Sequence, residues 1–206
     1  MPIHPSGAPY RIVLPDLEMR CWEPADAPEL QRFLADNDEY LRPWVPWMAD
    51  EPKPLEAKVK ELRSWRAAFD LDQTWLWSLR LSGGALAGGS VMNRLPGDAV
   101  DLGGWGTAEL GGRGLYGRAA AAATRVAFEL LGMARVQGIC ESTNTRSIHV
   151  MRRLGFTHEA TPRHEVEGQR IDEMVWSILA EEWPSTPACA LAADAQAFDA
   201  LGERMF

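Results

Sequence analysis

The stretch that decides the fold reads DLGGWG at residues 101–106, continues with GGRGLYG at 111–117, and leads into the Ala-rich segment 119–123. Its order is a short strand, a glycine-rich turn and a helix. Glycine lets the chain turn tightly, so that consecutive backbone N–H groups point outward. The N-terminus of the following helix adds partial positive charge. The stretch therefore predicts a strand–turn–helix unit that can bind a pyrophosphate.

Two common phosphate motifs do not describe this turn. The GK[ST] ending of a P-loop is missing. The dinucleotide fingerprint GxGxxG fits only loosely, at Gly112, Gly114 and Gly117, and no first βαβ unit surrounds it. A glycine-rich turn that binds nothing is therefore an alternative for this segment taken alone.

Hydrophobic periodicity extends the pattern in both directions. Period two predicts strands at 74–81, 85–95 and 99–106, with one or two short strands within 10–22 and further strands at 135–140, 156–163 and 171–179. Helical spacing predicts helices at 27–34, 55–69, 115–131 and 144–154. This order indicates a mixed α/β sheet with helices on its faces. We expect residues 1–183 to form a single domain, and the Ala-rich tail 184–206 to be a weak helix or disordered.

Composition narrows the function classes. The chain has 206 residues and a net charge of -8, which is a poor basis for binding nucleic acid or an anionic membrane. It has no apolar run long enough for a membrane span. Its three Cys and four His lack metal-ligand spacing, so we expect no metal site and a cytoplasmic protein. Residues 113–170 nevertheless contain nine Arg, no Lys and five Glu, a local excess of +4 that suits phosphate recognition.

Nine Trp residues are another feature of the composition. Trp75 and Trp77 alternate with Leu76 and Ser78 on one predicted strand, and we expect them to face opposite sides of the sheet.

Three passages carry a family resemblance. They are LRPWVPW at 41–47, ESTNTRSIHVMRRLGF at 141–156 and IDEMVWSILAEEW at 171–183. With the glycine-rich turn, they make the sequence resemble the GNAT N-acetyltransferase superfamily, and within it the RimJ/RimL-type protein N-terminal acetyltransferases. Gly114 matches the central glycine of that family's turn, whereas Gly111 and Tyr116 depart from the family's pattern.

The resemblance implies an α/β (α+β) fold with a mixed, mostly antiparallel twisted sheet of about seven strands, and acetyl-CoA as co-substrate. It also implies that the strand around Gly104 and Thr107 separates from its neighbour and faces the thioester. The residues expected to bind acetyl-CoA are Thr107, Gly112, Arg113, Gly114, Leu115, Tyr116, Gly117, Arg118 and Asn144.

Acetyl transfer also requires a proton for the leaving thiolate and a base for the amine. Met151 stands where many members of the superfamily have a Tyr that donates this proton. Our hypothesis for this acid is Ser147, one helical turn earlier on the same face, as its position in the RimL-like group implies. The alternative is a helix serine bonded to the carbonyl four residues before it.

For the base we favour Glu165 in the hairpin HEVEGQ at 164–169, with His164 second and Glu109 as a further candidate. The alternative is that the charged groups of the hairpin are only solvated and that water relays the proton of the amine.

The acceptor is expected to be a primary amine, in the first place a protein N-terminal α-amine. The resemblance places Trp44 and Trp47, held by prolines, by the acceptor entrance, and with Trp105 they are the residues expected to line its site. For Trp44 and Trp47 the alternative is packing under the loop. The alternatives are a small-molecule amine, such as an antibiotic or polyamine, and a non-catalytic acyl-CoA sensor. The resemblance also implies a possible homodimer.

Overall fold

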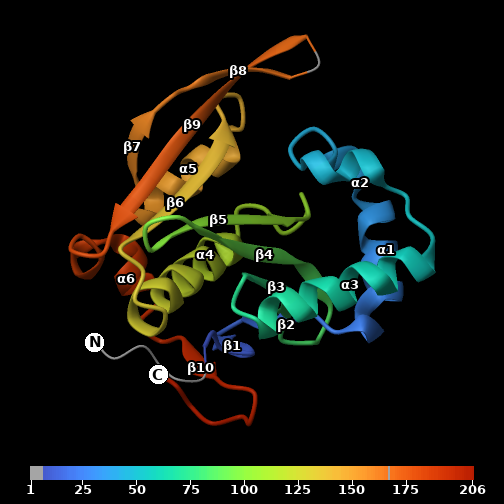
Figure 1. Ribbon diagram of the computed structural model, residues 1–206, viewed down its shortest axis with the longest axis horizontal. Coiled ribbons are helices and arrows are strands. Elements are labelled where there is room, and N and C mark those ends of the chain that lie inside the picture. Colours follow the sequence, from blue (N-terminus) through green and yellow to red (C-terminus); the bar gives the residue numbers. More distant parts are fainter. Residues whose placement is uncertain (1–6, 167) are drawn as a thin grey trace.

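A computed structural model describes residues 7–166 and 168–206 and contains a single large sheet (Figure 1). The strand order is β10-β1-β2-β3-β4-β5-β6-β9-β7, with β8 paired to β9. Of the strand pairs described, β5 with β6 is parallel and the others are antiparallel. The strands are β1 Arg11–Leu14, β2 Leu17–Cys21, β3 Thr74–Leu81, β4 Leu86–Leu95, β5 Ala99–Gly106, β6 Arg135–Glu141, β7 Thr157–Ala160, β8 Arg163–Val166, β9 Gln169–Leu179 and β10 Gln196–Phe198.

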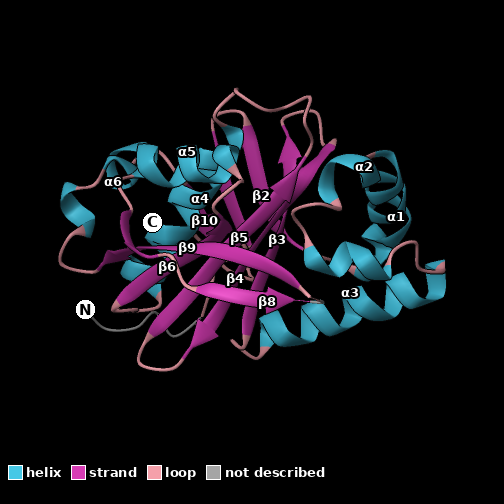
Figure 2. Cartoon of the chain, turned by 90° about the horizontal axis from the view of Figure 1, so that it is seen from above, coloured by secondary structure: helices cyan, strands magenta, loops and turns pink. Residues whose placement is uncertain are grey.

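Helices cover both faces of this sheet. Figure 2 shows α4, α5 and α6 on one side and α1, α2 and α3 on the other. The helices are α1 Ala27–Asp36, α2 Asp38–Leu41, α3 Leu55–Asp70, α4 Leu115–Arg125, α5 Thr145–Leu154 and α6 Pro187–Leu191. The mixed, mostly antiparallel α/β architecture is therefore confirmed, and the described ranges contain ten strands where about seven were expected.

The apolar side chains form two buried clusters. The larger one combines the sheet with the Ala-rich face of α4 and with α5 and α6. The second one contains Trp22, Leu30 and Leu62 and lies with α1 and α3. Trp75 and Trp77 both belong to the larger cluster, whereas Leu76 packs against the second. The expectation that these two Trp face opposite sides was wrong, because residues two apart on a strand share a face.

The C-terminal segment 184–206 differs from the expected tail. It contributes the short helix α6 and the strand β10, which pairs with β1. Ala188, Ala192, Ala195 and Ala197 are buried in the larger cluster. Their side chains are too small to show a clear hydrophobic period, yet small enough to pack closely against α4. The segment is therefore part of the same core as the rest of the chain.

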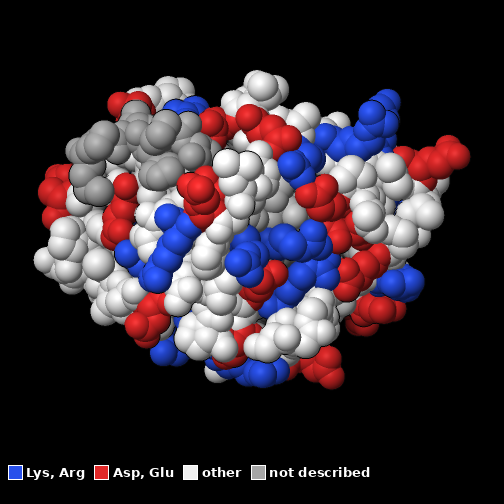
Figure 3. All heavy atoms as spheres, turned by 90° about the horizontal axis from the view of Figure 1, so that it is seen from below, with Lys and Arg blue, Asp and Glu red and all other residues white. Residues whose placement is uncertain are grey.

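Charged side chains of both signs are interspersed on the face seen in Figure 3. The excess of Arg in residues 113–170 is partly used within the protein, since Arg118, Arg125, Arg135 and Arg170 each pair with a carboxylate. None of the helices in the described ranges has the length and apolar character needed to cross a membrane.

Candidate active site

The parallel strands β5 and β6 separate after a short paired segment. Their register runs from Ala99 opposite Arg135 to Asp101 opposite Gln137 and stops there. Beyond this point β5 stays paired with β4, and β6 stays paired with β9. The two strands thus enclose a wedge, which we call the V, with its narrow end at Asp101 and its open end beyond Gly106 (Figure 1). This is the separation that the family resemblance implied.

The turn before α4 presents unbonded N–H groups. Within the described chain, the backbone N–H groups of residues 112–117 donate no hydrogen bond, and the first bonded one is Arg118 N, to Gly114 O. Gly112 and Gly114 have φ of 77° and 75°, a conformation that favours glycine. Six consecutive donors at a helix N-terminus match what a pyrophosphate requires. The residues present therefore fit the phosphates of acetyl-CoA.

Tyr116, in the first turn of α4, turns its phenol inward. Its Oη accepts a hydrogen bond from Thr107 N at 2.8 Å and donates one to Ala87 O at 3.0 Å. A Cβ on Gly106 would lie 2.2 Å from the Tyr116 ring, so glycine there makes room for the ring. The pKa of Tyr116 is raised, mainly because the phenol is buried and also because Tyr40 is near. The hydrogen bonds with Thr107 offset part of this increase. The Thr107 N–H is thus already bonded, and Tyr116 offers the turn only its backbone N–H.

The two Arg residues of the turn differ in their partners. Arg118 Nη2 lies 2.6 Å from Asp16 Oδ2, in the connection between β1 and β2. Arg113 is exposed and has no ion pair with the described residues. Arg118 therefore ties the turn to the sheet, and Arg113 is the guanidinium free to reach a phosphate.

The first turn of α5 borders the open end of the V. Asn144 caps the helix, since its Oδ1 accepts a hydrogen bond from Ser147 N at 3.1 Å. The half-buried Ser147 makes no side-chain hydrogen bond within the described residues, so the bond to the Thr143 carbonyl is not formed. Met151, one turn later, lies directly against Gly138 of β6 near the narrow end of the V. Ser147 therefore lies one turn closer to the open end, with its hydroxyl free.

A carboxyl group that the sequence analysis did not single out lies at the narrow end. Asp101 Oδ1 accepts a hydrogen bond from Gln137 Nε2 at 3.3 Å. The pKa of Asp101 is raised, mainly because the carboxyl group is buried and also because the Glu173 carboxylate is near. The hydrogen bond from Gln137 offsets part of this increase. Strand alternation was the available signal, because the buried Val100 and Leu102 point to the opposite face.

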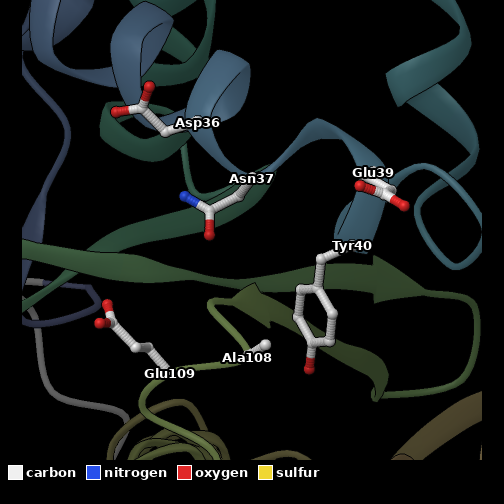
Figure 4. A pocket seen from close by; sticks show the side chains of 6 residues that line it. All are labelled: Asp36, Asn37, Glu39, Tyr40, Ala108 and Glu109. Carbon is white, nitrogen blue, oxygen red and sulfur yellow. The ribbon is translucent and has the colours of Figure 1, made fainter.

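A hollow of about 510 Å³ lies between the α1–α2 corner and the segment after β5 (Figure 4). It is open to solvent, and three of its six lining side chains are carboxylates. The lining residues are Asp36, Asn37, Glu39, Tyr40, Ala108 and Glu109. Glu109, a candidate base from the sequence, thus faces this hollow.

The three Trp residues expected at the acceptor site separate into two groups. The Trp105 ring lies 5.7 Å from that of Trp47 and 6.2 Å from that of Trp22, in an aromatic cluster under α1. Trp44 is 38% exposed. The structure brings Trp47 and Trp105 together as part of the packing and leaves Trp44 at the surface.

The two hairpin candidates for the base lie on β8, in the hairpin that projects at the top of Figure 1. Glu165 is exposed and pairs in register with Arg170. His164 Nε2 lies 3.2 Å from Glu173 Oε2 of β9. His164 therefore connects the hairpin to the carboxylate that also influences Asp101.

The unbonded N–H groups of the turn and the separation of β5 from β6 are the features that the family resemblance implied for binding acetyl-CoA. The model of the acetyltransferase (GNAT) domain matches residues 16–157, and the chain belongs to this family. It is an acetyl-CoA-dependent N-acetyltransferase. In the part of the chain that the structure describes, no group of three or more His, Cys, Asp or Glu could hold a metal ion.

Solved structures share the fold of this chain. A probable acetyltransferase is 25% identical over 82% of this chain and 96% of its own, with a TM-score of 0.73. RimJ of Mycobacterium smegmatis in complex with CoA-disulfide is 21% identical over 93% of this chain and 97% of its own, with a TM-score of 0.78. The microcin C7 self-immunity acetyltransferase MccE, in complex with acetyl-CoA and AMP, is 17% identical over 86% of this chain and 98% of its own, with a TM-score of 0.74. A search of curated proteins found no match.

Proposed function

We propose that this protein transfers the acetyl group of acetyl-CoA to the α-amine of a protein N-terminus. The observation that carries this proposal is the acidic hollow beside the open end of the V. Because it is open to solvent, an extended chain end can enter it. Its carboxylates favour an acceptor that arrives as an ammonium ion. A solved structure of similar fold is described as RimL, a ribosomal L7/L12 alpha-N-protein acetyltransferase, and this supports the same acceptor class.

Acetyl-CoA, when bound, supplies an acetyl group activated as a thioester. In this proposal the N–H groups of residues 112–117 and the Arg113 guanidinium hold its phosphates. The arm lies in the V beside Gly104. Asn144 acts by capping α5 and thereby fixing the first turn that carries Ser147.

Ser147 is proposed as the residue that holds the proton for the departing thiolate. Its hydroxyl is free within the described chain, and it lies on the turn of α5 nearest the open end. The neighbouring Met151 has no proton to give. This leaves Ser147 as the hydroxyl that α5 offers on this face.

The attacking amine must lose a proton, and two carboxyl groups can be compared as its acceptor. Glu165 is exposed on the hairpin, whereas Asp101 is half-buried and burial raises its pKa. A base works only when deprotonated, so the acid limb of the pH–rate profile reports the group that acts as the base. We expect Glu165→Gln to remove this limb and lower kcat/KM about a hundredfold.

Asp101→Asn is the matched comparison for Glu165, since it also replaces one carboxyl by an amide. The profile of kcat/KM against pH should keep its acid limb in Asp101→Asn and lose it in Glu165→Gln. The reverse result would move the role of base from the hairpin to the narrow end of the V.

The acceptor class is tested by following thiol release from acetyl-CoA with a panel of amines. The panel contains short peptides with free N-termini, the same peptides with blocked N-termini, polyamines and aminoglycosides. We expect release only with free N-termini. Release only with polyamines or aminoglycosides would replace the protein acceptor by a small molecule. Binding of acetyl-CoA with no release from any amine would indicate a sensor.

A further inference from the structure

One contact joins the α1–α2 side of the molecule to α5. The guanidinium carbon of Arg146 lies 5.0 Å from the centre of the Tyr40 ring. Tyr40 belongs to α2, is half-buried and packs against the second apolar cluster. Arg146 lies in the first turn of α5, directly before Ser147. A cation over an aromatic face is an attractive arrangement.

This contact lies across the open end of the V. Tyr40 lines the hollow together with Ala108, which follows the end of β5, and Figure 4 shows its side chain directed from α2 toward that region. Arg146 follows the end of β6. Each partner therefore adjoins one of the two strands after they have separated. The Tyr40–Arg146 contact connects the two arms of the V at the side where the sheet leaves them unconnected.

Neither partner is engaged by another polar group of the described chain. Tyr40 Oη has no hydrogen bond there, and Arg146 has no carboxylate within ion-pair distance. Arg118 and Arg135, in contrast, are each paired with an acidic side chain. The stacking contact is thus what holds Arg146 over α2, while its N–H groups and the Tyr40 hydroxyl stay free for a ligand.

We propose that Tyr40 and Arg146 are positioning residues that bridge the V and retain the thioester end of acetyl-CoA against β5. The inference rests on the proposed placement of the acetyl-CoA arm in the V. When Tyr40 and Arg146 are in contact, the acetyl-CoA arm in the V is surrounded by β5, β6 and the first turn of α5. The Tyr40–Arg146 contact closes the remaining side. Opening the bridge removes that side, so the ligand leaves faster.

The test measures the dissociation rate of acetyl-CoA from the full chain by stopped-flow displacement with a fluorescent coenzyme A analogue. Tyr40→Leu and Arg146→Gln should each raise this rate about threefold to tenfold, the range that one cation–π contact supports. The double variant should be no faster than the faster single variant, because both changes remove the same contact. Tyr40→Phe keeps the ring and should retain the rate of the unmodified protein.

Arg94→Gln is the matched control. Arg94 lies 5.2 Å from the ring centre of Trp75, so the substitution removes a similar contact elsewhere and should leave the dissociation rate unchanged. Equal rates in all variants, or rates that add in the double variant, would overturn the bridge while leaving the proposed function intact. If the unmodified protein binds no acetyl-CoA, both proposals fail together.

Discussion

Ser147→Ala should lower kcat about a hundredfold and leave the affinity for acetyl-CoA within about twofold of the original. The hydroxyl is free within the described chain, so its removal breaks no internal hydrogen bond. The cap of α5 is preserved, because Asn144 accepts its bond from the backbone N–H of residue 147. Only the supply of a proton to the leaving thiolate is changed.

The measurement is steady-state release of coenzyme A together with calorimetric binding of acetyl-CoA. Ser142→Ala is the control, since Ser142 is exposed in the turn before α5. An unchanged kcat in Ser147→Ala would remove Ser147 from the mechanism. A loss of acetyl-CoA affinity with an unchanged kcat would make it a binding residue instead.

Gly106→Ala should destabilise the fold by about 3 kcal/mol or more. The added Cβ would lie 2.2 Å from three atoms of the rigid Tyr116 side chain, which must then leave its place. Its hydrogen bonds with Thr107 N and Ala87 O would be lost, and the buried partners would stay unpaired. For a chain of this length we expect the melting temperature to fall by roughly 6–12 °C.

Gly117→Ala is the control for this substitution, because a Cβ there meets no atom within 4 Å. The double variant Gly106→Ala/Tyr116→Leu should be destabilised less than the two single variants added together, since the smaller side chain relieves the clash. Two outcomes would show that the position of the Tyr116 ring does not depend on Gly106. In one, the decreases in melting temperature of the single variants add up in the double variant; in the other, Gly106→Ala is as stable as the original protein.

Much of the architecture was predictable because it depends on local periodicity. Alternation marked the strands β3, β4 and β5, and helical spacing marked α3 and α4. The narrow end of the V was harder to predict. Asp101 and Gln137 are 36 residues apart in the sequence, and only the pairing of β5 with β6 places them opposite each other. The Ala-rich C-terminal segment was misjudged because small side chains carry little pattern, although the packed core accepts them readily.

The expected site residues divide in the same way. The free N–H groups of the turn are a local feature, and the structure forms them where the sequence suggests them. Asn144, expected to bind acetyl-CoA, caps α5 in the structure. The roles of Ser147 and Glu165 stay predictions. Trp105, expected at the acceptor, packs with Trp47 and Trp22, because strand direction decides which face its ring covers. Its role at the acceptor stays a prediction.

The sequence by itself determined the strand–turn–helix unit and the family, because glycine spacing, helix capping and periodicity act between residues close along the chain. The tertiary structure decided what surrounds that unit. It placed Tyr40 under Arg146, Tyr116 against Gly106, and carboxylates from α1, α2 and the segment after β5 around one hollow. These arrangements depend on how the sheet twists and on which helix covers which face, and no short stretch of sequence encodes either.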